Sequence, residues 1–271
     1  MARNASRIVS LALTLGVSAT GCGRGTDASL SNSALETSPD SEPMIVAMGG
    51  YNSCGSEDPK KIMETLEGTS PENLPGSRGS GPRGMGMFQK FNALKNKLRD
   101  KYGIESRYII SCFTSAAAAY YRSSASPDEL KTVETKDYPN LVGTHMRRGS
   151  PLYMIGHSHG GWLAIKNTLA LANEVSVDAL FSSDPISRVY CRPPAITGCT
   201  GFPQDITKDN QEEVKGTTGY WLNAWQSQTF YLHSGPSGSA DDNMKISAGH
   251  TAMDNHVDLW AKIDAKVTER L

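Results

Sequence analysis

The sequence predicts an α/β fold, in which a mainly parallel sheet is covered by helices on both faces. Short apolar runs that suit buried strands alternate with longer segments whose apolar residues recur at helical spacing. The 271 residues, of which 38% are hydrophobic, suffice to bury one full core. The formal net charge of -1 argues against a protein that binds nucleic acid through its overall charge.

The first residues are predicted to be a targeting segment. Two arginines supply positive charge, and the apolar run Ile8–Val17 is too short to span a bilayer as a permanent helix. The residues up to Cys22 resemble a bacterial lipobox, although Ala19 stands where that pattern prefers leucine. We therefore predict a lipoprotein signal peptide over residues 1–21 and a lipid anchor on Cys22, at the outer membrane or in the periplasm. Ordinary signal-peptidase cleavage, with secretion, is the alternative.

The amino-acid composition distinguishes a polar segment after the predicted signal peptide from the globular domain that follows it. Residues 22–43 are expected to be a disordered tether, because Ser, Asp, Thr and Pro dominate and large apolar side chains are almost absent. The globular domain is expected to span residues 44–271.

The remaining cysteines are even in number, which in an oxidising compartment suggests two disulfides. Cys191 and Cys199 are close enough in sequence to close a small loop, and Cys54 and Cys112 each follow a predicted strand, so they could meet at the same end of the sheet. Four cysteines allow three pairings, so these two remain candidates. No cysteine spacing indicates a zinc site.

The elements of the domain are expected in alternating order. Strands are predicted at residues 44–48, 108–113, 152–155, 177–181, 229–232 and 244–246. Helices are predicted around three apolar stripes: Phe88, Phe91, Leu94 and Leu98; Trp162, Ile165, Leu169 and Ala172; and Val257, Trp260, Ile263 and Val267. In such a sheet, ligands lie beyond the carboxyl ends of the strands, so chemistry is expected in the loops that follow strands.

The strongest motif is Gly156-His157-Ser158-His159-Gly160, which matches G-x-S-x-G. It lies between an apolar strand and an amphipathic helix, which is the context that this motif requires. A sharp turn there would present the Ser158 hydroxyl at the start of a helix, whose dipole favours developing negative charge. Ser158 is therefore the candidate nucleophile.

The segment PLYMIGHSHGGWLAI resembles the nucleophile elbow of lipases and esterases of the α/β-hydrolase family, in which GHSHGG is common. The resemblance implies an α/β-hydrolase fold, a serine, acid, histidine order along the chain, and no metal or organic cofactor. It also implies a small cap insertion, which we place at residues 186–226 because that segment precedes the fifth predicted strand.

The same resemblance suggests an oxyanion hole. One donor would be the backbone N–H of His159, which follows the nucleophile. The other would come from the loop after the first strand, where Gly50 precedes Tyr51, and the backbone N–H of Tyr51 is the candidate. A tight turn without a role in binding is the alternative for this loop.

The acid and the base have rival candidates. Asp184 follows the fourth predicted strand, and LFSSDPIS resembles the segment that carries the acid in pancreatic-type lipases. Asp241 or Asp242 is the alternative, after the fifth predicted strand. His250 is the candidate base because it lies between the last strand and the last helix, whereas His233 and His256 are the alternatives.

These residues predict a serine hydrolase that cleaves carboxylic esters through a Ser158–His250–Asp184 triad and an acyl-enzyme. Small-molecule or lipid esters outside the cytoplasm are the expected substrates. The alternatives are a peptidase or thioesterase of the same fold, and a non-catalytic binding protein on a hydrolase scaffold.

Overall fold

A computed structural model of the chain describes residues 42–51, 53–54, 59–68, 85–113, 117–123, 126–133, 138–172, 174–187, 189, 191 and 199–269. The expected signal peptide, Cys22 and nearly all of the expected tether lie outside these residues. The described residues belong to one compact unit. None of the helices that they form is long and apolar enough to cross a bilayer.

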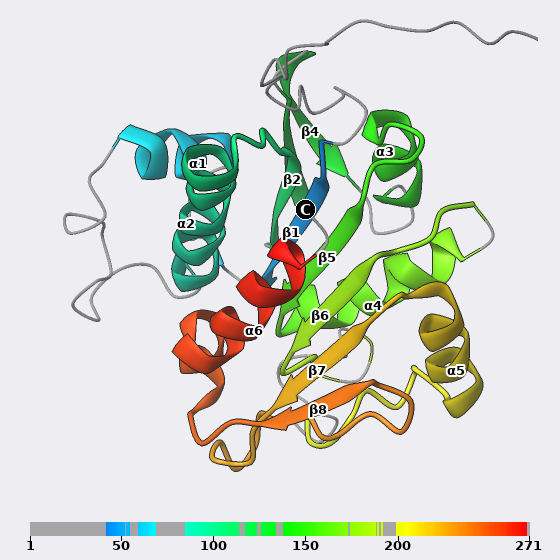
Figure 1. Cartoon of the computed structure of the whole chain (residues 1–271). Helices are drawn as coiled ribbons and strands as arrows, with labels where there is room; N and C mark the ends of the chain where they lie inside the picture. The colour runs from blue at the N-terminus through cyan, green and yellow to red at the C-terminus, as the bar shows by residue number, and fades with distance from the viewer. Residues whose placement is uncertain are drawn as a thin grey trace, which may run out of the picture. The chain divides into compact units, whose positions relative to one another are not determined.

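The described residues form one eight-stranded sheet (Figure 1). Its strands, in spatial order, are β4 (Ser126–Val133), β3 (Ala117–Ser123), β2 (Arg107–Phe113), β1 (Met44–Tyr51), β5 (Leu152–His157), β6 (Ala179–Ser183), β7 (Trp221–Trp225) and β8 (Asp242–Lys245). The neighbours from β2 to β8 run parallel, whereas β3 and β4 join the β2 edge antiparallel. The predicted α/β fold with a mainly parallel sheet is confirmed.

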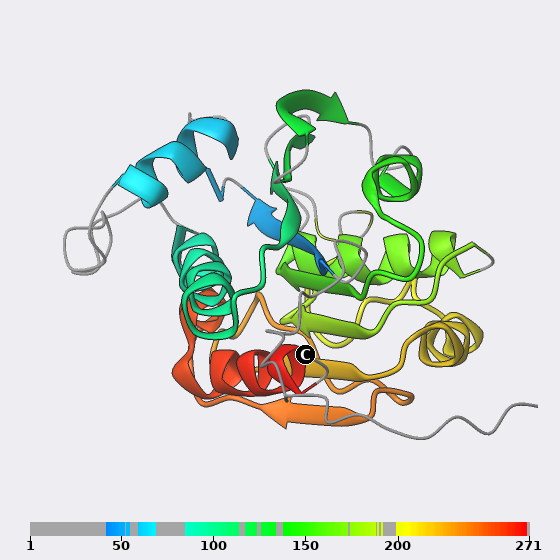
Figure 2. The ribbon, with the colours of Figure 1, turned by 45° about the horizontal axis from the view of Figure 1, so that its top comes forward.

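Helices cover the two faces of this sheet. Packed on one face are α1 (Pro59–Gly68), α2 (Met85–Tyr102) and α6 (Val257–Thr268), and on the other face α3 (Tyr138–His145), α4 (His159–Leu171) and α5 (Lys208–Thr217). Figures 1 and 2 show the two groups on opposite sides of the strands. The alternation of side chains along β1 explains this, because Ile45 and Ala47 enter one core while Val46 and Met48 enter the other.

The fifth predicted strand is wrong. Residues 229–232 form a turn, and the strand beside β6 is β7, which lies within the segment expected to be a cap. Both segments contain several apolar or aromatic residues, but Trp221 is completely buried whereas Phe230 is 90% exposed. Helices α1, α3 and α5 and strands β3 and β4 were not predicted, whereas α2, α4 and α6 lie where the apolar stripes indicate.

Two disulfides are present, Cys54–Cys112 and Cys191–Cys199, with Cα–Cα distances of 5.6 and 4.9 Å. The first joins the residues after β1 to β2, and the second closes a loop between β6 and α5. Two disulfides are consistent with an exported protein, because the cytoplasm keeps thiols reduced.

Candidate active site

Ser158 lies on a strained turn between β5 and α4. Its φ is 59° and its ψ is -126°, and in the described part of the chain only Asp184 is another non-glycine residue with a positive φ, of 43°. Gly160 is required at this turn, since a Cβ there would lie 2.0 Å from the backbone oxygen of Met48. Strain of this kind persists only when the surroundings fix the residue, which marks Ser158 and Asp184 as functional candidates.

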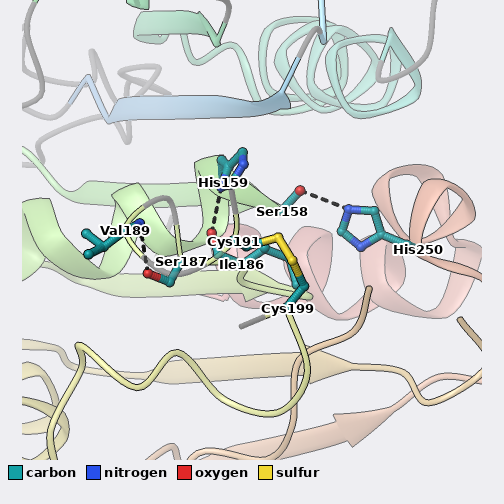
Figure 3. Close-up of a disulfide and its surroundings, with 8 residues drawn as sticks. All are labelled: Ser158, His159, Ile186, Ser187, Val189, Cys191, Cys199 and His250. Carbon is teal, nitrogen blue, oxygen red and sulfur yellow. Dashed lines mark hydrogen bonds between the residues drawn. A yellow bond between two sulfur atoms is a disulfide. The ribbon is translucent and has the colours of Figure 1, made fainter. Parts of the chain in front are cut away.

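The backbone around Ser158 is tied to the segment that follows β6. Ser158 N–H donates to Ser183 O at 2.9 Å, and Ile186 N–H donates to Ser158 O at 3.0 Å. The His159 ring adds a third link, because its Nδ1 lies 2.8 Å from Ile186 O (Figure 3). The nucleophile turn and the turn at Asp184 are therefore held together as one unit.

The structure brings Ser158, His250 and Asp184 into one chain of hydrogen bonds. Ser158 Oγ lies 2.9 Å from His250 Nε2, as Figure 3 shows, and His250 Nδ1 lies 2.7 Å from Asp184 Oδ2. A carboxylate oxygen only accepts, so Nδ1 carries the proton and Nε2 is free to accept the serine proton. The three side chains are buried, and they follow β5, β6 and β8 at the carboxyl ends of the strands.

Asp184 is completely buried, yet it is held in its charged form. Burial alone would raise its pKa, but the hydrogen bond and charge of His250 and two further donors outweigh burial, so the pKa lies below 3.8. Those donors are Ser234 N–H, 2.6 Å from Oδ1, and Gln226 Nε2, 2.8 Å from Oδ2. Asp184 can therefore orient the imidazole and stabilise its protonated form.

Gln226, which sequence reasoning missed, organises the loop around this carboxylate. It is fully buried, and its Nε2 donates to Asp184 and also to Leu232 O at 2.9 Å. Its Oε1 accepts the backbone N–H groups of Gln228 and Thr229 at 2.7 and 2.9 Å. Gln226 directly follows β7, so the signal that could have found it is a polar residue at the carboxyl end of a buried strand.

The end of β1 lies against the nucleophile. A Cβ on Gly50 would lie 2.8 Å from Ser158 Cβ and 3.3 Å from Ser158 Oγ, so glycine lets the backbone approach the hydroxyl. The backbone of Tyr51 continues β1 and pairs with Phe113 of β2. His159 is the first residue of α4, so its N–H lies at the N-terminal end of that helix, where the helix dipole favours negative charge.

The rival acids lie at the opposite edge of the sheet. Asp241 and Asp242 precede or begin β8, whereas Ser158 and Asp184 follow their strands. Asp241 forms an ion pair with Lys215 and accepts Trp221 N–H at 2.8 Å, and Asp242 forms an ion pair with Lys262.

The rival bases do not contact Ser158. His233 Nδ1 lies 2.8 Å from Thr229 O, and His256 precedes α6, with its Nδ1 3.9 Å from Asp258. In the described part of the chain, no group of three or more His, Cys, Asp or Glu side chains could hold a metal ion.

No family model and no curated protein matches the chain. Among solved structures, the chain is similar to a secreted C11 cysteine protease from Bacteroides thetaiotaomicron, iotapain, with 12% sequence identity and a TM-score of 0.31. The similarity covers 71% of this chain and 55% of that protein, so the chain spans about half of its length. At this TM-score the likeness transfers neither fold nor activity, and the chemistry of this chain rests on its own side chains.

The expected relationship to bacterial lipases and esterases is contradicted by this comparison, which finds a cysteine protease. The prediction of a carboxylic ester hydrolase, a lipase or serine esterase, is wrong by the same finding. The motif could not have settled the matter. G-x-S-x-G specifies how a serine is presented between a strand and a helix, whereas the substrate is selected by other residues.

Proposed function

We propose that this chain is a serine-type hydrolase that cleaves amide bonds. Ser158 is the nucleophile, His250 the general base and Asp184 the residue that orients the base. The observation that carries the proposal is the continuous relay from Ser158 Oγ through both nitrogens of His250 to Asp184, with contacts of 2.9 and 2.7 Å.

The reaction proceeds in two halves. His250 Nε2 accepts the Ser158 proton as Oγ attacks the carbonyl carbon, and the imidazolium then donates that proton to the departing amine. This leaves an acyl group on Ser158. Water, deprotonated by the same nitrogen, attacks the acyl-enzyme. As the C–Oγ bond breaks and the acid leaves, the imidazolium returns that proton to Ser158 Oγ, which restores the serine and the neutral base.

The oxyanion that forms in each half is stabilised by the backbone N–H of His159 and that of Tyr51. Two observations support this assignment. His159 begins α4, whose dipole favours negative charge at that end. Gly50 lies against Ser158, so the end of β1 is close enough to supply a second donor.

The nucleophile is an oxygen and not a sulfur. Each of the four cysteines in the described ranges is bonded to another in a disulfide, so none of them offers a thiolate. Ser158 combines a strained turn with an adjacent imidazole, which are the two features that an activated hydroxyl needs.

The amide class is proposed because of what the leaving group requires. A thiolate leaves without help, whereas an amine must be protonated as the C–N bond breaks. The imidazole of His250, fixed between a buried carboxylate and Ser158, is positioned to deliver that proton.

We further propose an α/β-hydrolase type of sheet, without membership of the lipase and esterase family. Its nucleophile, acid and base follow β5, β6 and β8 in chain order, and Gly50 lies at the end of the central strand β1. The cap then consists of the shorter segment between β6 and α5, where Cys191–Cys199 closes a loop.

The place of action is proposed from the N-terminus and the disulfides. The chain is exported, and lipid on Cys22 anchors it to a membrane, so that the enzyme meets peptides or other amides outside the cytoplasm.

The test uses an alkyl fluorophosphonate probe, peptide anilides, an acyl thioester and a short ester with the purified full chain. Ser158→Ala should lose both labelling and anilide hydrolysis, while its thermal melting temperature stays near that of the wild type. Absence of labelling in folded wild-type protein would overturn the proposal. Labelling with turnover of the thioester or ester but of no anilide would overturn the amide assignment alone.

A further inference from the structure

The backbone of His250 is hydrogen-bonded by two side chains from different parts of the chain. His157 Nε2 lies 2.9 Å from His250 O, and His250 N–H donates to Thr229 Oγ1 at 3.0 Å. His157 is the last residue of β5, directly before the nucleophile, and Thr229 lies between β7 and β8. The base is therefore linked through its main chain to both the nucleophile strand and the loop around Asp184.

His157 has a fixed role as a donor. A carbonyl oxygen only accepts, so Nε2 of His157 carries the proton. The ring is buried, and burial followed by the nearby charge of His250 lowers the pKa of His157 to about 3. The ring centroids of His157 and His250 lie 4.9 Å apart, so the two imidazoles also pack against each other.

Thr229 has a fixed position as an acceptor. Its own N–H donates to Gln226 Oε1 at 2.9 Å, and its carbonyl oxygen lies 2.8 Å from His233 Nδ1. Since Gln226 also holds Asp184, the same buried amide positions the acid and the residue that accepts from the base.

His250 needs an external acceptor because of where it lies. It is the first residue of the 3₁₀ helix His250–Asn255, and the first N–H groups of a helix have no partner within it. Thr229 satisfies that N–H, and His157 pairs the carbonyl oxygen of the same residue.

We propose that His157 and Thr229 are positioning residues that clamp the backbone of His250 and thereby set the separation of its Nε2 from Ser158 Oγ. This inference rests on the proposed function. Asp184 alone allows the imidazole to swing about the Nδ1 contact, whereas two main-chain bonds fix the origin of the side chain. Because a displacement of about 1 Å can cost about 100-fold in rate, the clamp should appear mainly in kcat.

The decisive variants replace Thr229. Thr229→Val keeps the volume and removes the acceptor oxygen, whereas Thr229→Ser keeps the hydroxyl. We expect Thr229→Val to lower kcat about 10- to 100-fold with KM nearly unchanged, and Thr229→Ser to recover most of that loss. The control is Thr168→Val, since Thr168 is fully buried, more so than Thr229, but its hydroxyl bonds only to Ala164 O within α4.

His157 is tested in the same way. His157→Phe keeps the ring and removes the donor, and it should lower kcat, whereas His157→Gln, whose amide can donate, should recover part of it. If His157→Phe does not fold, the Thr229 variants still decide the matter, because valine fills the space of threonine. Wild-type kcat in folded Thr229→Val would overturn the clamp.

A measurement that does not depend on catalytic turnover distinguishes a failure of this inference from a failure of the proposed function. The proton shared between His250 Nδ1 and Asp184 gives a far-downfield proton NMR resonance, whose exchange with water reports how firmly the imidazole is held. Faster exchange in Thr229→Val supports the clamp even if the wild type proves inactive, which would overturn the function alone. Unchanged exchange and unchanged probe labelling in an active enzyme would overturn the clamp and leave the function standing.

Discussion

Two buried carboxylates lie near the base, and they differ in ionisation. Asp184 contacts the His250 imidazole, and its pKa lies below 3.8. Asp254 lies at the other end of the 3₁₀ helix that His250 begins, is 4% exposed, and has a pKa raised by burial to about 6. Similar depth in the protein thus leads to opposite shifts.

The difference lies in the partners. Asp184 receives the imidazole of His250, the amide of Gln226 and a backbone N–H, all in direct contact. Asp254 receives backbone N–H groups, chiefly that of Met87, and feels the charge of His250 only at a distance. The direct hydrogen bond and charge of the His250 imidazole therefore keep Asp184 charged, whereas backbone N–H donors do not offset burial at Asp254.

The largest effect is expected when Asp184 loses its charge. Asp184→Asn keeps the shape but presents an amide to Nδ1, which favours the wrong tautomer of His250, and such a change lowers kcat about 10⁴-fold in related triads. The measurement is kcat and KM on the substrate cleaved best by the wild type. Activity within tenfold of the wild type would remove Asp184 from its role.

The next effect is expected at Gln226. Gln226→Met removes a donor from Asp184 and leaves Leu232 O and two N–H groups without their partner, so we expect a loss of stability of about 2 kcal/mol or more and a lower kcat. The matched control is Gln228→Met, because that side chain bonds only to Ser247 Oγ at the surface. Equal melting temperatures for both variants would contradict the role given to Gln226.

Sequence reasoning reached the nucleophile side of this site more easily than the loop around the acid. Ser158 lies between a fully buried strand and a helix that is itself mostly buried, so the apolar residues on both sides of the motif were sufficient to place it. Gln226 and Thr229 follow β7, and the sequence pattern places that strand eight residues too late. Trp221 and Phe230 are both large aromatic residues, so the pattern does not tell which of them is buried. Only tertiary packing buries one and exposes the other.

The contacts of His157 could not be predicted for a related reason. Along a strand, side chains alternate between faces, which says on which side His157 lies but not what approaches it. The carbonyl of His250 comes from a segment distant in sequence, and its position depends on the 3₁₀ helix that the sequence did not indicate.

A smaller effect, on the free energy of unfolding, is expected when Asp254 is replaced. Its folded pKa lies above its unfolded value, so its contribution is favourable below pH 3.8 and is lost as the pH rises to about 6. Asp254→Asn removes the buried charge and should stabilise the protein at pH 7.5 by roughly 1–3 kcal/mol. The difference between variant and wild type should shrink as the pH falls from 6 to 3.8, as measured by urea unfolding. A variant that is less stable at pH 7.5 would show that its hydrogen bonds outweigh burial.

The smallest effect is expected at Asp242, a carboxylate away from the site. Its ion pair with Lys262 is partly exposed, and such pairs contribute about 0–1 kcal/mol. Asp242→Asn should therefore leave kcat unchanged and lower the unfolding free energy by no more than that amount. Because Asp242 begins β8, at the edge of the sheet away from Ser158, a large loss of kcat would show that the acid had been assigned to the wrong edge. An unchanged kcat beside an inactive Asp184→Asn would show that the position of a carboxylate in the relay, and not its charge alone, matters to the reaction.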